Sequence, residues 1–202
     1  MGMNRRGVLA LAAAGAAALF PGGAAAAAGA AEENADSEWP ELAHFLYGRG
    51  FWYADPLREV RGLTTEQLLW VPDPQSLCML WQVGHVAHRE RTHIGRFLQG
   101  LEGEIIPPQY EVFGTDWHSA GQVMDSIESV EAAFDWVRDV RRESHAFVDS
   151  LREEDFHRVP PTTESELSIA HWLFITTAHT ALHVGKIQLL RSLVEGTKDR
   201  PC

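Results

Sequence analysis

The sequence predicts an all-α protein, a four-helix bundle with an additional short helical turn. Apolar residues recur at three- and four-residue intervals in four long segments, and no segment shows the alternation typical of a strand. Proline- and glycine-rich stretches separate these segments. The 202 residues, 45% hydrophobic and 22% charged, suit one globular domain. Four amphipathic helices in one domain of this size are expected to pack as a bundle.

The N-terminal segment, residues 1–31, is expected to be an export signal that is cleaved. Arg5 and Arg6 precede a weakly apolar run, Val8–Phe20, and small residues suited to cleavage follow. That run is too short to span a bilayer. The arginine pair favours the twin-arginine route. We therefore expect a periplasmic or extracellular domain over residues 32–202, and the alternative is an alanine-rich tail without a targeting role.

Four long helices are expected in the domain. They are placed at residues 38–54, at about 77–101, from about 130 to 151, and at about 168–194. Asp125 and Ser129 are both candidate N-caps for the third helix, and Gly196 is typical of a helix stop after the fourth.

Shorter helical segments and a loop are expected between these helices. Asp55 and Pro56 are typical of an N-cap followed by a first-turn proline, and residues 64–70 form a helical turn. The stretch 103–121 is rich in proline and glycine and is expected to be a loop. Its residues Tyr110, Phe113 and Trp117 are candidates either for a pocket mouth or for core anchoring.

The net charge makes nucleic acid a poor candidate partner. Loss of Arg5 and Arg6 with the signal lowers the basic count from 17 to 15 against 28 acidic residues, so the net charge changes from −11 to −13. No basic stripe is present to bind phosphates. The two cysteines, Cys78 and Cys202, leave a disulfide open. Cys78 is interpreted as a buried helix-start cysteine rather than a metal ligand.

A histidine pair, His179 and His183, stands out in the stretch TAHTALHVGKIQLLR. Residues four apart share one helix face, so both imidazoles can reach one ion. Ten histidines make one such pair unsurprising by chance, so hydrogen-bonded core histidines are the alternative. The pair is expected to share its inward stripe with Trp172, Ile175, Leu182, Lys186 and Leu190. Residues expected elsewhere on this helix are Thr177, Thr180, Gln188 and Arg191.

A third ligand is expected from the second long helix, in LWQVGHVAHRE. His85 lies in its most apolar part and is the best candidate, with His88 in reserve. His93 lies about 80° round an α-helix from His85, and Glu90 about 140° round, so Glu90 is not expected to share its ion. His88 and His93 are interpreted mainly as members of a solvated charged face. Arg141, on the third helix, is expected either on a solvated face or pointing inward to bind a substrate anion.

The order of these motifs resembles the DinB-like superfamily of metal-binding four-helix bundles. The likeness covers about residues 42–196 and rests on LWQVGHVAHRE followed by HTALHVGKIQLLRSLVEG. It implies that His85, His179 and His183 bind a divalent metal, which three imidazoles leave open among zinc, nickel, iron and manganese. Lys186 stands where many members have glutamine, which is a departure in the surroundings of the ligands.

The resemblance implies a metal-dependent hydrolase or thiol transferase that acts on a small molecule. Small thiol cofactors are cytoplasmic, so export favours hydrolysis or the alternative function, a non-enzymatic, stress-associated metal-binding bundle. The sequence names no substrate. No stable membrane span is expected, and pairing of exposed bundle faces into a homodimer is expected by analogy alone.

Overall fold

The computed structural model describes residues 55–162 and 165–196, and every described element is helical. The expected export signal with its cleavage site, the helix at 38–54 and Cys202 lie outside the described residues. Among the described helices, none combines the length and apolarity that crossing a membrane requires. The all-α fold class is confirmed, and three of the four predicted long helices fall within the described part.

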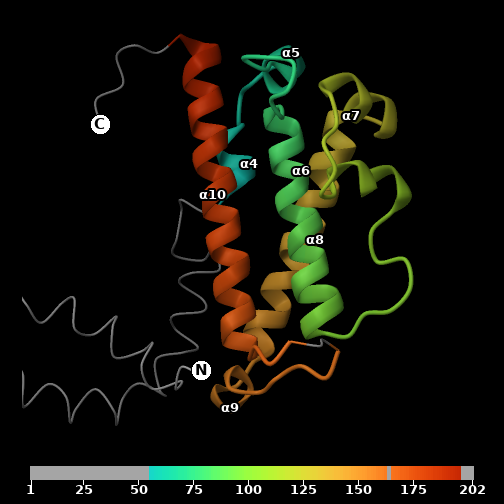
Figure 1. Ribbon diagram of the computed structural model, residues 1–202, viewed down its shortest axis with the longest axis vertical. Helices are drawn as coiled ribbons and strands as arrows, with labels where there is room; N and C mark the ends of the chain where they lie inside the picture. Colours follow the sequence, from blue (N-terminus) through green and yellow to red (C-terminus); the bar gives the residue numbers. More distant parts are fainter. Residues whose placement is uncertain (1–54, 163–164, 197–202) are drawn as a thin grey trace, which may run out of the picture. The chain divides into compact units, whose positions relative to one another are not determined.

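Three long helical segments lie side by side (Figure 1). The middle one is α6 (Met79–Glu90), which continues into η2 (Arg91–Leu98) and packs against both α8 (Val130–Ser150) and α10 (Ile169–Glu195). Because α6 contacts both other helices, almost every one of its side chains is buried. The short elements are α4 (Pro56–Glu59), α5 (Thr65–Leu69), η3 (Pro108–Phe113), α7 (Ala120–Ser126) and α9 (Glu153–Phe156).

Local capping explains where most of these helices begin and end. The Asp55 carboxylate accepts a hydrogen bond from the backbone N–H of Leu57, and Thr64 with Gln67 forms a capping box on α5. Gly196 ends α10 in the left-handed conformation, at φ 62°. The roles of Asp55 and Gly196 were predicted from the sequence, because each depends on neighbours within a few residues.

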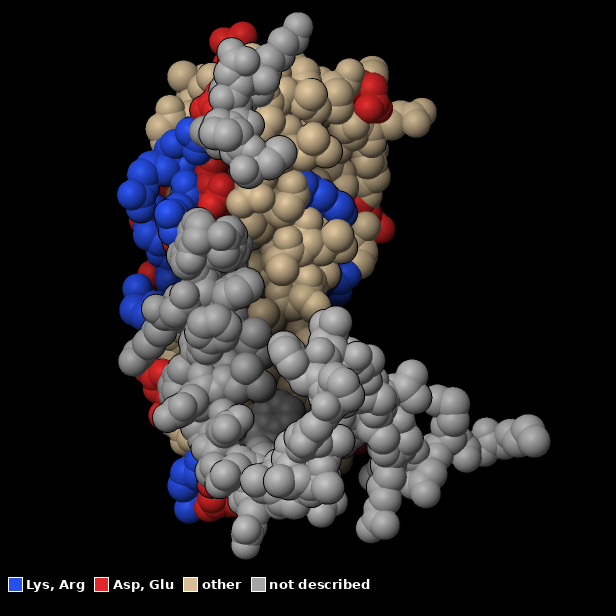
Figure 2. Space-filling model, turned by 90° about the vertical axis from the view of Figure 1, so that its left-hand side faces the viewer, with Lys and Arg blue, Asp and Glu red and all other residues tan. Residues whose placement is uncertain are grey.

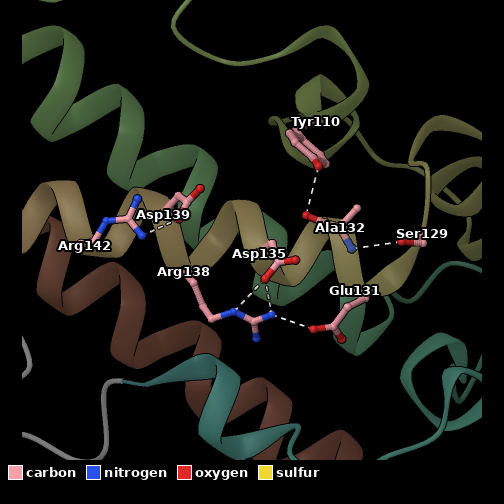
Figure 3. Close-up of polar contacts among 8 residues, drawn as sticks. All are labelled: Tyr110, Ser129, Glu131, Ala132, Asp135, Arg138, Asp139 and Arg142. Atoms are coloured by element: carbon pink, nitrogen blue, oxygen red, sulfur yellow. Dashed lines mark hydrogen bonds and ion pairs between the residues drawn. The ribbon is translucent and has the colours of Figure 1, made fainter.

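The start of α8 decides between the two predicted caps. Ser129 accepts a hydrogen bond from the N–H of Ala132 at 3.0 Å, as Figure 3 shows. Asp125 lies inside α7, so its prediction as a cap is wrong. The predicted loop at 103–121 is also partly wrong, because it contains η3 and the first two residues of α7. A capping box between Ser119 and Gln122 starts α7.

The segment containing η3 is fastened to two helices. The Tyr110 hydroxyl donates to the carbonyl of Ala132 on α8 (Figure 3), and its ring stacks on Trp136 at 4.4 Å. The Phe113 ring is fully buried against Gly84 of α6, where an added Cβ would lie 2.4 Å from ring carbons. The core-anchoring interpretation therefore holds for Tyr110 and Phe113, whereas Trp117 is half exposed.

The predicted inward stripe of α10 is wrong in part. Ile175, Leu182 and Lys186 are exposed, whereas Thr177 and Thr180 are buried. The two threonine hydroxyls donate to carbonyls four residues earlier, which satisfies them inside the protein. The apolar residues of α10 lie on all sides of the helix, so their spacing in the sequence does not identify the buried face. Figure 2 views the side on which α10 lies, where a broad uncharged area is visible beside a column of charged residues, mainly Lys and Arg, along the left edge.

The polar residues between α6 and α8 form buried contacts that the sequence did not predict. Glu90 is completely buried and accepts a hydrogen bond at 2.9 Å from the guanidinium of Arg141, which is largely buried as well. Arg141 is therefore not on a solvated face, and its pairing with Glu90 replaces the predicted role in binding a substrate anion. Arg91, which follows Glu90 in the chain, forms an ion pair with Glu143 on α8. These ion pairs join the two helices.

Replacement of Gly84 with Ala tests the close packing of η3 on α6. The new methyl group competes with the Phe113 ring, so we expect the free energy of unfolding to fall by about 1–3 kcal/mol. Gly185→Ala in α10 is the matched control, because no neighbouring atom lies within 4 Å of its added Cβ. The control is expected to gain about 0.5–1 kcal/mol from helix propensity. Urea denaturation measures both, and equal changes would contradict the packing.

Candidate metal centre

Three histidines from two helices converge at the contact between α6 and α10. Each of His85, His179 and His183 offers a ring nitrogen, and these three atoms all lie within 4.8 Å of one another. The ring centroids are 4.4 Å apart for the pair on α10, and His85 lies 5.1 Å from His179 and 4.7 Å from His183. The structure thus brings together the trio that was singled out in the sequence.

The ring of His85 is held in one tautomer by two backbone carbonyls. Its Nδ1 lies 2.8 Å from the oxygen of Phe113 and 2.9 Å from that of Gly114. Carbonyl oxygens only accept, so Nδ1 carries the proton and Nε2 keeps its lone pair. Trp81 stacks on the ring at 4.3 Å and fixes its plane. The packing of η3 on Gly84 therefore determines which nitrogen of His85 can bind an ion.

His183 is oriented in the same way by a side chain of α6. Its Nδ1 lies 2.5 Å from Oε1 of Gln82, which is buried beside it. The amide oxygen accepts the Nδ1 proton, so Nε2 of His183 also presents a lone pair. The sequence analysis missed Gln82. The available signal was its position three residues before His85, which places both side chains on one face of α6.

The spacing of the pair on α10 fits two ligands of one ion. The Nε2 atoms of His179 and His183 are 3.2 Å apart. Two nitrogens about 2.1 Å from one ion, at angles between octahedral and tetrahedral, are separated by about 3.0–3.4 Å. The same distance also permits a hydrogen bond in which His179 donates to His183. The donor set and its spacing therefore fit a divalent metal, and a hydrogen-bonded pair is the metal-free arrangement.

Burial keeps these imidazoles neutral, which metal ligation requires. Desolvation lowers the pKa of His85 and of His179 from 6.5 to about 4, and that of His183 to about 3. The positive charges of Arg89 and of neighbouring histidines act in the same direction. At neutral pH each of the three rings therefore has one unprotonated nitrogen, whose lone pair can bind a metal ion.

His88 and His93 are not members of a solvated charged face, so that interpretation is wrong. His88 is buried, its Nε2 lies 3.2 Å from the Glu111 carboxylate, and it stands outside the trio. The ring of His93 packs beside those of Phe97 and Trp172, and burial lowers its pKa to about 4.

The change of helix type at Arg91 explains the position of His93. Hydrogen bonds in η2 span five residues, so each residue turns by roughly 80° instead of 100°. His93 then lies about 30° round from His85, rather than about 80°. Its ring centroid is 6.4 Å from that of His179, and its Nδ1 lies 3.1 Å from the Thr176 hydroxyl.

Cys78 is not part of the cluster. Its side chain is buried at the start of α6, its thiol is free, and burial raises the pKa of that thiol. This agrees with the interpretation of a buried helix-start cysteine. Its predicted alternative, a disulfide with Cys202, involves a residue outside the described part of the chain.

The fold and the cluster define an all-α protein whose three convergent histidines can hold a metal ion. A family model described as the DinB superfamily matches residues 54–187, about two thirds of the chain, and the chain belongs to that superfamily. Comparison with curated proteins found no match, and comparison with solved structures found none either.

The stability of the metal-free protein is expected to fall as the pH is lowered from 7 to 4. The unfolded chain takes up protons near the ordinary pKa of 6.5, whereas His85, His179 and His183 resist protonation in the folded chain until pH 3–4. Below pH 6.5 the unfolded state therefore binds more protons and is favoured. Thermal melting across this range measures the effect.

His183→Gln is the matched variant for this measurement, because it removes one of the three titrations. Its melting temperature is expected to change less steeply between pH 7 and pH 4 than that of the wild type. Identical slopes would show that His183 is not held neutral in the folded chain.

Proposed function

We propose that this protein binds one divalent metal ion through Nε2 of His85, His179 and His183 and uses it in hydrolysis of, or group transfer to, a small molecule. The observation that carries the proposal is the convergence of three ring nitrogens from α6 and α10. For two of the rings, hydrogen bonds at Nδ1 reserve Nε2 for a ligand. Membership of the DinB superfamily supports the same chemistry.

The proposed chemistry assigns distinct work to the ion and to the protein. A divalent ion with an open position lowers the pKa of a bound water or thiol and polarises a substrate oxygen. The residues of this chain set the geometry: Phe113, Gly114 and Gln82 orient two ligands, and Trp81 stacks on the first. Three protein ligands leave room for substrate, as in catalytic rather than structural zinc sites.

A non-enzymatic metal-binding protein is the second candidate, and one observation favours it. No described carboxylate forms a hydrogen bond or ion pair with the three histidines. None of the described Asp or Glu side chains is therefore already held against these ligands, where a general base could be positioned. Export through the twin-arginine route, which we retain as a proposal, favours hydrolysis or this second function over thiol transfer. The substrate, the metal and a homodimer belong to the proposal as well.

Replacement of His183 with Ala is expected to abolish stoichiometric metal binding. Two histidines remain in the variant, too few to hold the ion firmly in a site that needs three. Elemental analysis of protein purified without chelators or added metal is the measurement, with about one ion per chain expected in the wild type. His88→Ala is the control, because His88 is buried nearby but stands outside the trio.

The ligand assignment is wrong if the His183→Ala variant keeps its metal, or if His88→Ala loses it to the same extent. An assay of small esters, amides and thiol acceptors with the metal-loaded protein separates the first candidate function from the second. Turnover that disappears in His183→Ala supports an enzyme, and binding without turnover supports the alternative.

Replacement of Gln82 with Leu is expected to weaken metal affinity by about 10–100-fold while leaving all three ligands in place, because the Nδ1 proton of His183 loses its acceptor. Gln82→Glu keeps an acceptor and is expected to bind at least as tightly as the wild type. Competition with a chromophoric chelator measures the three affinities. Equal affinities for the Leu and Glu variants would exclude an orienting role for Gln82.

A further inference from the structure

Arg89 is a half-buried cation near the histidine centre, and the described part of the chain supplies no counter-ion for it. It follows His85 by four residues on α6, so the two side chains lie on one face, one turn apart. No hydrogen bond or ion pair joins the Arg89 side chain to the described residues. By contrast, the partly buried Arg91 and Arg141 are each paired with a glutamate.

The described charged groups that act on the three histidines are cations. The guanidinium of Arg89 lowers the pKa of His85, His179 and His183, and the ammonium group of Lys186 does so for the latter two. No carboxylate is among the groups that shift these three pKa values. Such cationic surroundings are unusual in a chain of net charge −11, where acidic residues outnumber basic ones.

A divalent ion would increase this excess of positive charge. Three neutral imidazoles contribute no negative charge, so the ion would add two positive charges to those of Arg89 and Lys186. Unbalanced charge in a partly desolvated position is costly, and water screens it only in part. An anion supplied from outside the described chain would remove that cost.

We propose that the small molecule received by this centre carries a carboxylate, which Arg89 binds while another group of the same molecule reaches the histidines. The inference rests on the proposed function and specifies its substrate class. A guanidinium suits this task because it forms two parallel hydrogen bonds with a carboxylate. Lys186 is exposed and adds long-range attraction without a fixed geometry.

Small thiols that differ only in charge test the proposal on cobalt-loaded protein. Mercaptoacetate and 3-mercaptopropionate carry a carboxylate, whereas 2-mercaptoethanol is neutral, and the thiolate band of cobalt reports the binding of each. We expect the wild type to prefer the better of the two acids to mercaptoethanol by about tenfold or more. Arg89→Met is expected to reduce this preference to about twofold or less.

Two further variants complete the comparison. Arg89→Lys keeps the charge and is expected to retain part of the preference, which also guards against a folding defect in the Met variant. Lys186→Met removes an exposed charge from α10 and is expected to keep most of the preference. Equal losses in Arg89→Met and Lys186→Met, or a wild type with no preference, would overturn the Arg89 subsite.

Cobalt stoichiometry, measured first, distinguishes this failure from failure of the metal site. A wild type that binds no cobalt overturns the proposed function, and the subsite with it. One cobalt per chain together with an unchanged preference in Arg89→Met overturns the subsite alone.

Discussion

A neutral imidazole has one proton, and the placement of that proton determines what the centre can do. In His85 and His183 the proton is fixed on Nδ1 by carbonyl oxygens, so both Nε2 lone pairs face the same small volume. Two of these acceptors belong to Phe113, the last residue of η3, and to Gly114, which follows it, and the third belongs to Gln82 on α6. The packing of η3 and α10 against α6 therefore matters for chemistry as well as for stability.

Several local features of α6 serve this arrangement. Gly84 has no side chain, which lets the Phe113 ring lie against the helix and brings two carbonyls to the adjacent His85. One turn later Arg89 continues the same face. The π-helical stretch that begins at Arg91 then rotates His93 toward His179, and π-helical turns are frequent at functional sites. The face of α6 that packs on α10 thus combines ligands, their supports and a cation.

The sequence predicted what depends on local patterns. Helix caps such as Ser129, and the shared face of His179 and His183, follow from spacing within a few residues. The apolar setting of His85 made it the best candidate for the third ligand, and the resemblance to the DinB superfamily implied the same residue. Tertiary contacts determined the rest: Gln82 meets His183 across a helix interface, and Glu90 meets Arg141 across another. The exposed side of α10 was predicted wrongly because that helix has apolar residues on all sides. The position of His93 was predicted wrongly because a regular α-helix was assumed.

X-ray absorption spectroscopy of the zinc-loaded protein tests the central claim most directly, because it reports the ligand atoms themselves. A centre made of His85, His179 and His183 predicts three imidazole nitrogens at about 2.0–2.1 Å and the remaining positions filled by light atoms. Sulfur at about 2.3 Å would instead place Cys78 or another thiol on the ion. Sulfur in the first shell, or fewer than three imidazoles, would contradict the three-histidine centre.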